Sequence, residues 1–258
     1  MKQYLLSITV LLFSISSSFA QDKKPNLNIV FIGNSITQGV QLPDAANDAP
    51  PATAVTYLRK QENLGTVEFS NQGHSGYTTL NFLPGAGDTF TKVETAANTF
   101  TDKEALLIFS VKLGTNDSAI QGPRGAPVSP ENYIRNVKTI IDKLLADFPK
   151  AIVILQHPIW YSPNTQNGAK YLQEGLTRLQ SYIPKIDSLA ASYSTISPKH
   201  VFVGDKKAFK YFRKHHLTDL IPENGKQGIF YLHPNKQGAV ALGEFWGKAI
   251  NRVVKAMQ

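Results

Sequence analysis

The sequence predicts a single three-layer α/β domain, in which a parallel β-sheet lies between two layers of helices. Two observations lead to this prediction. Apolar runs of strand length alternate with helical patterns along the chain. Several of these runs are continuously apolar, as expected for strands that a parallel sheet buries on both faces. No linker, repeat or low-complexity stretch interrupts the 258 residues, so one domain is expected.

The first half of the chain contains three predicted strands and one predicted helix. The strands are Leu27–Ile32, Val67–Ser70 and Ala105–Val111, which are rich in Val, Ile, Phe or Leu. The helix, Ala52–Gln61, has apolar residues at helical spacing. The segment Val40–Ala52, rich in Pro and Ala, is interpreted as a loop.

The next predicted helix is Pro130–Phe148, where apolar residues recur three and four positions apart. Ser129 before it supplies an N-cap, and the proline at the first helical position is a further start signal. A strand is expected over Ala151–Leu155. The following helix, Tyr171–Ala191, is expected to break near Pro184 because proline cannot donate a helical hydrogen bond.

The last predicted elements are a strand over His200–Val203 and a closing helix over Gln237–Met257. Between them lies the densest basic run of the chain, Lys206–Lys214. Its interleaved Phe209 and Phe212 fit one apolar face of a short helix. We interpret the charges as a solvated helix face, with an anion-binding patch as the alternative.

The amino terminus has the pattern of a secretory signal peptide over residues 1–20. Lys2 provides the positive start, an apolar stretch follows, and small residues precede a cleavage position after Ala20. The sequence therefore predicts a mature domain of residues 21–258 that is exported, to the periplasm or beyond. No stable membrane anchor is expected after cleavage, because no later stretch approaches ~18 consecutive apolar residues. An uncleaved anchor is the alternative.

Composition excludes several classes of protein. The chain has no cysteine, which excludes disulfide scaffolds, Cys-ligated zinc, iron–sulfur clusters and thiol catalysis. The net charge of +8 favours an acidic partner, yet no nucleic-acid-binding motif is present. We therefore expect no nucleic-acid partner, no metal and no cofactor. The sequence contains no signal for an oligomeric state.

Candidate site residues follow the predicted strands, where an open α/β sheet binds its ligand. Ser35 follows the first strand, Gly73 the second and Asn116 the third, while His233 precedes the last helix. Taken singly, each is an ordinary cap, turn or structural residue in many proteins. His74 is a possible base, although a pocket-wall role is the more ordinary interpretation.

Taken together, these residues resemble the four sequence blocks of the SGNH hydrolases, the GDSL family of esterases and lipases. The blocks are Ile32-Gly33-Asn34-Ser35-Ile36-Thr37, Asn71-Gln72-Gly73-His74-Ser75-Gly76, Gly114-Thr115-Asn116-Asp117 and His233-Pro234-Asn235. They occur in the family's order and extend from the first strand to the last helix. The resemblance implies a flavodoxin-like five-stranded sheet and hydrolysis of esters through an acyl-enzyme.

The resemblance also implies a role for each site residue. Ser35 is the expected nucleophile, and His233 is expected to take its proton. The oxyanion hole is expected to consist of the backbone N–H groups of Ser35 and Gly73 and the side chain of Asn116.

The chain departs from the family pattern at two positions. Asn34 stands where an Asp usually precedes the serine. Phe230 stands where an Asp, three residues before the histidine, usually orients the histidine ring. Either another carboxylate replaces that Asp, with Glu223 and Asp219 as candidates, or a backbone carbonyl does, or the enzyme works as a Ser–His dyad.

The substrate class is the least determined feature of the sequence. The resemblance is to exported bacterial glycan O-acetylesterases, because the chain has an export signal and polar and aromatic residues in the loops after its strands. These are Tyr77, His157, Trp160, Tyr161, Asn164, Gln166 and Asn167. They suit sugar rings, or they merely line the loops. A lysophospholipase or general short-chain carboxylesterase is the alternative, and a non-catalytic carbohydrate-binding protein is a third possibility.

Overall fold

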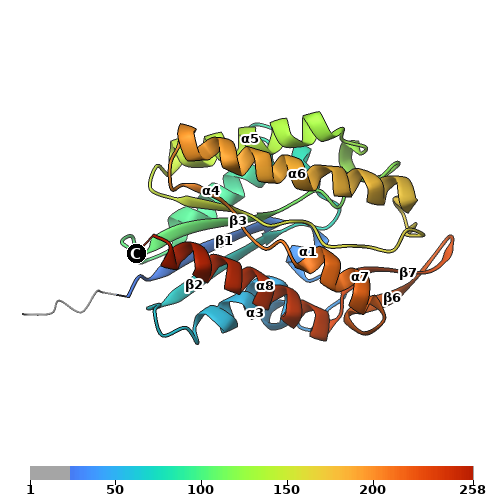
Figure 1. Ribbon diagram of the computed structural model, residues 1–258, viewed down its shortest axis with the longest axis horizontal. Helices are drawn as coiled ribbons and strands as arrows, with labels where there is room; N and C mark the ends of the chain where they lie inside the picture. The colour runs from blue at the N-terminus through green and yellow to red at the C-terminus, as the bar shows by residue number, and fades with distance from the viewer. Residues whose placement is uncertain (1–23, 258) are drawn as a thin grey trace, which may run out of the picture.

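The computed structural model describes residues 24–257, which form one α/β domain around a five-stranded parallel sheet (Figure 1). The strand order is β2-β1-β3-β4-β5. The strands are β1 (Leu27–Gly33), β2 (Val67–Gly73), β3 (Leu106–Lys112), β4 (Ile152–Leu155) and β5 (Val201–Val203). Each coincides with a predicted apolar run, so the predicted α/β class and sheet are confirmed.

Helices cover both faces of this sheet and make the three layers (Figure 1). α4 (Thr89–Thr99), α5 (Pro130–Asp147) and α6 (Leu172–Ile196) lie over one face. α3 (Pro50–Leu58) and α8 (Lys236–Lys255) pack together on the other. The predicted signal peptide lies outside the described residues. Among residues 24–257, no helix is long and apolar enough to cross a membrane.

The core is packed on both sides of the inner strand β1, whose seven residues are all buried. Phe31 of this strand stacks on Trp246 of α8, with ring centroids 6.1 Å apart. In the opposite layer, Tyr133 of α5 stacks on Tyr182 of α6 at 4.0 Å. Burial of this aromatic and aliphatic surface is the main stabilising contribution to the fold.

Helix α6 does not break at Pro184, and this prediction was wrong. The helix runs without interruption from Leu172 to Ile196. Pro184 is exposed, so the carbonyl that loses its N–H partner faces water. Tyr182 and Ile186, on either side of it, are buried. Their packing outweighs the unfavourable helix propensity of proline.

The basic run forms part of α7 (Ala208–Asp219), a helix with the predicted apolar face. Phe212 is fully buried and Phe209 packs against the core, while Arg213 and Lys214 are exposed. The sequence did not predict the antiparallel hairpin that follows, β6 (Leu220–Gly225) and β7 (Gly228–Pro234). A short helix, α2 (Ala45–Asp48), lies in the segment Val40–Ala52 that was interpreted as a loop, and α3 begins within the same segment. Two short 3-10 helices, η1 (Thr79–Phe82) and η2 (Pro123–Gly125), lie where the sequence predicted no helix.

Candidate active site

The turn after β1 presents Ser35 as the first residue of a short helix, α1 (Ser35–Gln38). Gly33 is required at this turn, because a Cβ there would lie 2.0 Å from Thr37 Oγ1 and 2.9 Å from the Lys112 carbonyl. The side chain of Asn34 caps the helix by accepting a hydrogen bond from Ile36 N at 3.1 Å. Asn34 therefore shapes the turn.

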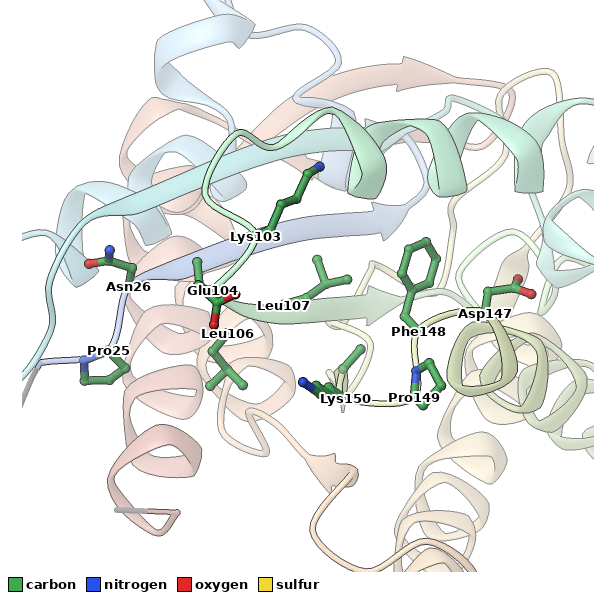
Figure 2. Close-up of a pocket in the computed structure, with 12 residues that line it drawn as sticks. Pro25, Asn26, Lys103, Glu104, Leu106, Leu107, Asp147, Phe148, Pro149 and Lys150 are labelled. Carbon is green, nitrogen blue, oxygen red and sulfur yellow. The ribbon is translucent and has the colours of Figure 1, made fainter.

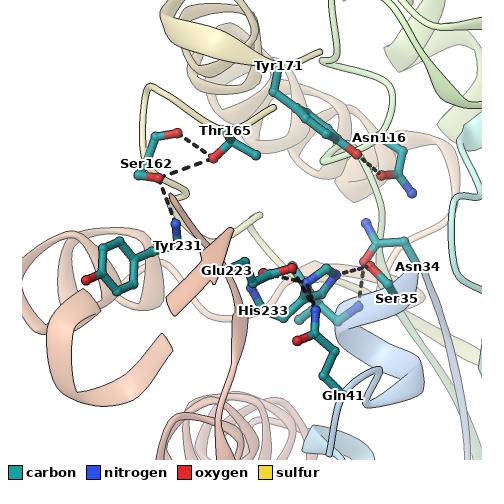
Figure 3. A network of polar contacts seen from close by, with 11 residues as sticks. Asn34, Ser35, Gln41, Asn116, Ser162, Thr165, Tyr171, Glu223, Tyr231 and His233 are labelled. Atoms are coloured by element: carbon teal, nitrogen blue, oxygen red, sulfur yellow. Dashed lines mark hydrogen bonds and ion pairs between the residues drawn. The ribbon is translucent and has the colours of Figure 1, made fainter. Parts of the chain in front are cut away.

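Ser35, His233 and Glu223 form a continuous chain of hydrogen bonds (Figure 3). The distance from His233 Nε2 to Ser35 Oγ is 2.9 Å, and from His233 Nδ1 to Glu223 Oε1 it is 2.8 Å. Ser35 and His233 are 7% and 6% exposed, so both residues are almost entirely buried. A serine, a base and an orienting carboxylate in this order are the arrangement that activates a hydroxyl as a nucleophile.

The hairpin explains how a carboxylate reaches His233 although Phe230 occupies the usual position. Glu223 on β6 stands opposite Phe230 on β7, so the carboxylate comes from the neighbouring strand. Phe230 is itself buried, at 1% exposure, and packs into the core. The hairpin is held in place at Tyr231, whose N–H donates to Ser162 Oγ at 2.8 Å (Figure 3).

Asp219, the other carboxylate that the sequence offered, has a different role. Its carboxylate accepts hydrogen bonds from the Tyr211 hydroxyl at 2.7 Å and from Thr218 Oγ1 at 2.6 Å. These contacts hold the end of α7. The geometry thus favours Glu223 over Asp219, over a backbone carbonyl and over a dyad as the group that orients His233.

Gln41 is a site residue that the sequence analysis missed. Its Nε2 donates to Glu223 Oε2 at 2.7 Å and lies 3.2 Å from His233 Nδ1 (Figure 3). Its backbone has φ +70°, in the left-handed region that side chains with a Cβ seldom adopt. An unusual backbone conformation beside a catalytic constellation is a recognised sign of function, but no sequence pattern marks it.

The surroundings of Glu223 keep it ionised. Burial alone would raise the pKa of this carboxyl, but hydrogen bonds from His233 and Gln41 and the charge of His233 outweigh burial and hold its pKa below the ordinary value. An ionised carboxylate at Nδ1 favours the tautomer that leaves Nε2 free to accept a proton from Ser35.

Asn116 is held in one amide orientation. Its Oδ1 accepts a hydrogen bond from the Tyr171 hydroxyl at 2.8 Å, and its Nδ2 donates to the Tyr77 carbonyl at 2.8 Å. Burial raises the pKa of Tyr171, which keeps that hydroxyl protonated as a donor. An amide nitrogen carries two hydrogens, so one N–H of Asn116 is left for a ligand.

Gly73 ends β2 where its backbone approaches α1 closely. A Cβ at this position would lie 2.3 Å from the backbone nitrogen of Gln38, so only glycine fits. The N–H of Gly73 donates to Asn71 Oδ1 at 3.0 Å. To donate to an oxyanion, the Gly73 N–H would have to leave Asn71 Oδ1 or donate to both oxygens at once.

His74 lies in the wall next to this turn. Its ring stacks on Tyr77, with centroids 4.9 Å apart, and is tilted against Phe82. Burial, together with the positive charges of Lys92 and Arg124, lowers the pKa of His74 although Asp88 opposes them. The structure thus favours the wall role over that of the base.

Three of the seven loop residues expected to suit sugar rings are hydrogen-bonded through their side chains within the protein. His157 Nε2 lies 2.8 Å from Asp187, the Tyr161 hydroxyl bonds Ser118 Oγ at 2.9 Å, and Asn164 donates to the Ile229 carbonyl at 2.7 Å.

Among residues 24–257, no cluster of side chains suited to a metal ion occurs.

A cavity of about 570 Å³ lies away from this site (Figure 2). It is lined by the starts of β1 and β3, at Asn26 and Leu106, and by the end of α5. Because the strands are parallel, this cavity is at the end of the sheet opposite to Ser35.

Comparisons with known proteins agree with this geometry. A sequence model described as "GDSL-like Lipase/Acylhydrolase family" matches residues 31–241. No curated protein sequence matches the chain. A lipase/acylhydrolase from Enterococcus faecalis has a similar structure, with a TM-score of 0.58, 20% identity and coverage of 87% of this chain and 95% of that chain.

Two further solved structures are similar at 16% identity, and each match covers 90% of this chain and 99% of the other. One is an aryl esterase from M. smegmatis, with a TM-score of 0.57. The other is a carbohydrate acetylesterase from Sinorhizobium meliloti, with a TM-score of 0.55. At such identities the likeness concerns the fold.

Proposed function

The chain belongs to the GDSL-like lipase/acylhydrolase family, and we propose that it is an exported serine esterase that removes small acyl groups, chiefly acetyl, from carbohydrate. The observation that carries the proposal is the chain of hydrogen bonds from Ser35 Oγ through His233 to Glu223.

The proposed reaction has two halves. His233 Nε2 accepts the hydroxyl proton while Ser35 Oγ attacks the ester carbonyl, and the imidazolium then returns the proton to the leaving alcohol. Water, activated by the same ring, hydrolyses the acyl-enzyme and releases the acid. Glu223 holds the Nδ1–H of His233 and stabilises the imidazolium through both halves.

In each half, negative charge develops on the carbonyl oxygen. The free N–H of Asn116 and the backbone N–H of Ser35 at the start of α1 are its proposed donors. Gly73 adds a third donor after giving up Asn71 Oδ1. The N–H groups of Asn116 and Ser35 are preorganised donors, which need no rearrangement as the charge appears.

The choice of a sugar ester has weaker support. One structurally similar protein is described as a carbohydrate acetylesterase, and Tyr77, an aromatic residue, contacts the proposed oxyanion donor Asn116 through its backbone carbonyl. Acetate release from acetylated sugars tests the choice. We expect turnover of 4-nitrophenyl acetate and of acetylated sugars, with a steep fall for chromogenic esters of longer acids.

The second candidate is a general short-chain carboxylesterase or a lysophospholipase. The M. smegmatis and E. faecalis proteins, described as an aryl esterase and a lipase/acylhydrolase, favour it. Equal rates with acetyl and octanoyl esters, and no release of acetate from sugars, would establish this candidate in place of the first.

The proposed export rests on residues 1–20. Sequencing of the mature amino terminus, after expression with fractionation of the periplasm, should give a start near Gln21. A full-length protein that stays with the membrane fraction would favour the uncleaved anchor instead.

A further inference from the structure

The wall of the site carries a cationic group that the proposed reaction does not use. The guanidinium carbon of Arg124 lies 4.3 Å from the centre of the Tyr77 ring, which is a cation–π contact. Arg124 belongs to η2 and is exposed.

Two hydrogen bonds connect the loop of Arg124 with the proposed oxyanion hole. The backbone carbonyl of Tyr77 accepts a hydrogen bond from Asn116 Nδ2 at 2.8 Å, so the main chain of the residue whose ring lies under the guanidinium contacts a proposed oxyanion donor. The next residue, Thr78, donates through Oγ1 to the Arg124 carbonyl at 3.0 Å. The loop of Arg124 is therefore fastened to the wall of the site.

Apart from the Tyr77 ring, the guanidinium has no partner among residues 24–257. Among the described residues, no carboxylate pairs with Arg124, and its N–H groups make none of the hydrogen bonds found in residues 24–257. By contrast, four other arginines donate hydrogen bonds within the fold through their guanidinium groups. Those four are Arg59, Arg135, Arg178 and Arg252.

The backbone of Arg124 is also unusual. Its φ of +50° and ψ of 55° lie in the left-handed region, where a residue with a Cβ is disfavoured. Glycine follows at position 125 and precedes at position 122, so the neighbouring positions already have residues that tolerate positive φ. An arginine held in this conformation, stacked on an aromatic ring and unpaired, is preorganised to bind an anion.

We propose that Arg124 binds the carboxylate of the substrate, so that the ester hydrolysed at Ser35 is one on an acidic sugar. This inference rests on the proposed function, which places the ester carbonyl at Asn116. A guanidinium presents parallel N–H donors that match the two oxygens of a carboxylate, and the Tyr77 ring restricts its plane. A neutral sugar would leave these donors to water.

The test compares two substrates that differ only in charge: glucuronic acid and glucose, each acetylated at the same ring hydroxyl. Acetate release is measured with the wild-type enzyme, Arg124→Gln and Arg124→Lys. Arg213→Gln is the matched control. This substitution removes the same charge, but at an exposed arginine in the basic run on α7.

The expected result is a change in preference. The wild-type enzyme should favour the acidic sugar in kcat/KM by about 10- to 100-fold, as expected for a charge-assisted pair. Arg124→Gln should bring that ratio close to one, mainly through KM, and Arg124→Lys should retain part of it. Arg213→Gln should keep the wild-type ratio. Added salt should reduce the preference of the wild-type enzyme.

Different failures identify different errors. If the wild-type enzyme turns over 4-nitrophenyl acetate without preferring the acidic sugar, or Arg124→Gln keeps that preference, the Arg124 inference is wrong and the esterase proposal stands. Loss of preference in Arg213→Gln alone would move the anion site to α7. If no ester is hydrolysed, the proposed function fails. A binding measurement then still tests the role of Arg124. Calorimetry compares the affinity for acetylated glucuronic acid of Ser35→Ala with that of the double variant that also has Arg124→Gln, and equal affinities overturn the inference.

Discussion

The orientation of His233 depends on two side chains, Glu223 and Gln41, neither of which stands at the position where the family usually has its Asp. Glu223 Oε1 accepts from Nδ1, and Gln41 holds the other carboxylate oxygen. Both oxygens of Glu223 are therefore occupied, so the carboxylate cannot rotate without losing a hydrogen bond. A fixed carboxylate fixes the ring.

Replacing Glu223 by Gln should lower kcat/KM by as much as ~10⁴-fold, because an amide no longer selects the productive tautomer of His233. Steady-state kinetics with 4-nitrophenyl acetate measure the loss. Asp219→Asn is the control and should stay near the wild-type rate, since Asp219 bonds Tyr211 and Thr218 instead. Wild-type rates in both variants would mean that His233 needs no carboxylate.

Gln41→Gly should separate activity from stability. Glycine accepts φ +70° without strain, so the melting temperature should not fall, whereas kcat should drop about 10-fold as Glu223 loses a donor. Because the Gln41 hydrogen bond lowers the pKa of Glu223, its removal should raise that pKa. An unchanged kcat would show that Gln41 only covers the site.

At the scale of elements, the sequence predicted the five strands of the sheet but not the hairpin that carries Glu223. The strands were readable because most of them are continuous or nearly continuous apolar runs, and because Val67 and Phe69 mark the more polar β2. Strand β6 reads Leu-Ile-Pro-Glu-Asn-Gly, in which a proline and polar residues hide the extended conformation. Hence Ser35, Gly73, Asn116 and His233 could be located from the ends of elements, whereas the choice between Glu223 and Asp219 required the strand pairing.

Helix α6 offers a prediction at this scale. Pro184→Ala should raise the free energy of unfolding by about 1–3 kcal/mol, because alanine restores an N–H donor to an exposed helix interior. Urea denaturation measures the change. The control, Ser194→Ala on the same helix, should gain no more than about 0.5 kcal/mol. Destabilisation by Pro184→Ala would mean that α6 is shaped around the proline.

At the scale of the whole molecule, parallel strands bring the site residues together at one end of the sheet and bury charge beneath them. Lys112, the last residue of β3, is 1% exposed, and its Nζ donates to Thr115 Oγ1 at 2.9 Å. Burial lowers the pKa of Lys112 to about 7 although Asp117 opposes the shift, and burial raises the pKa of Asp117 to about 6. Lys112 and Asp117 therefore lie buried beneath the site, where their charged forms are unfavourable.

Burial of Lys112 makes the free energy of unfolding depend on pH, and the direction of its pKa shift gives the sign of that dependence. Above pH 7, the unfolded chain holds a proton on Lys112, up to the ordinary lysine pKa of ~10.4, that the folded chain has released. The free energy of unfolding should therefore rise with pH in this window, by up to ~1.4 kcal/mol per pH unit from this group.

Urea denaturation at pH 7 and pH 9 tests this dependence. Lys112→Met should lose that part of the slope, while Lys207→Met, at an exposed lysine, should keep the wild-type slope. Equal slopes in all three proteins would mean that Lys112 stays protonated in the folded state across this range.

The most direct test of the whole account is covalent labelling by a fluorophosphonate, which reacts with a serine only where that serine is activated. We predict labelling of the wild-type protein at Ser35, identified by peptide mass spectrometry, and none in Ser35→Ala. Ser75→Ala, which alters an exposed serine two residues after Gly73, should be labelled like the wild-type protein. His233→Ala should be labelled far more slowly. A folded wild-type protein that resists the probe, or is labelled equally in Ser35→Ala, would contradict the assignment of Ser35 as a nucleophile.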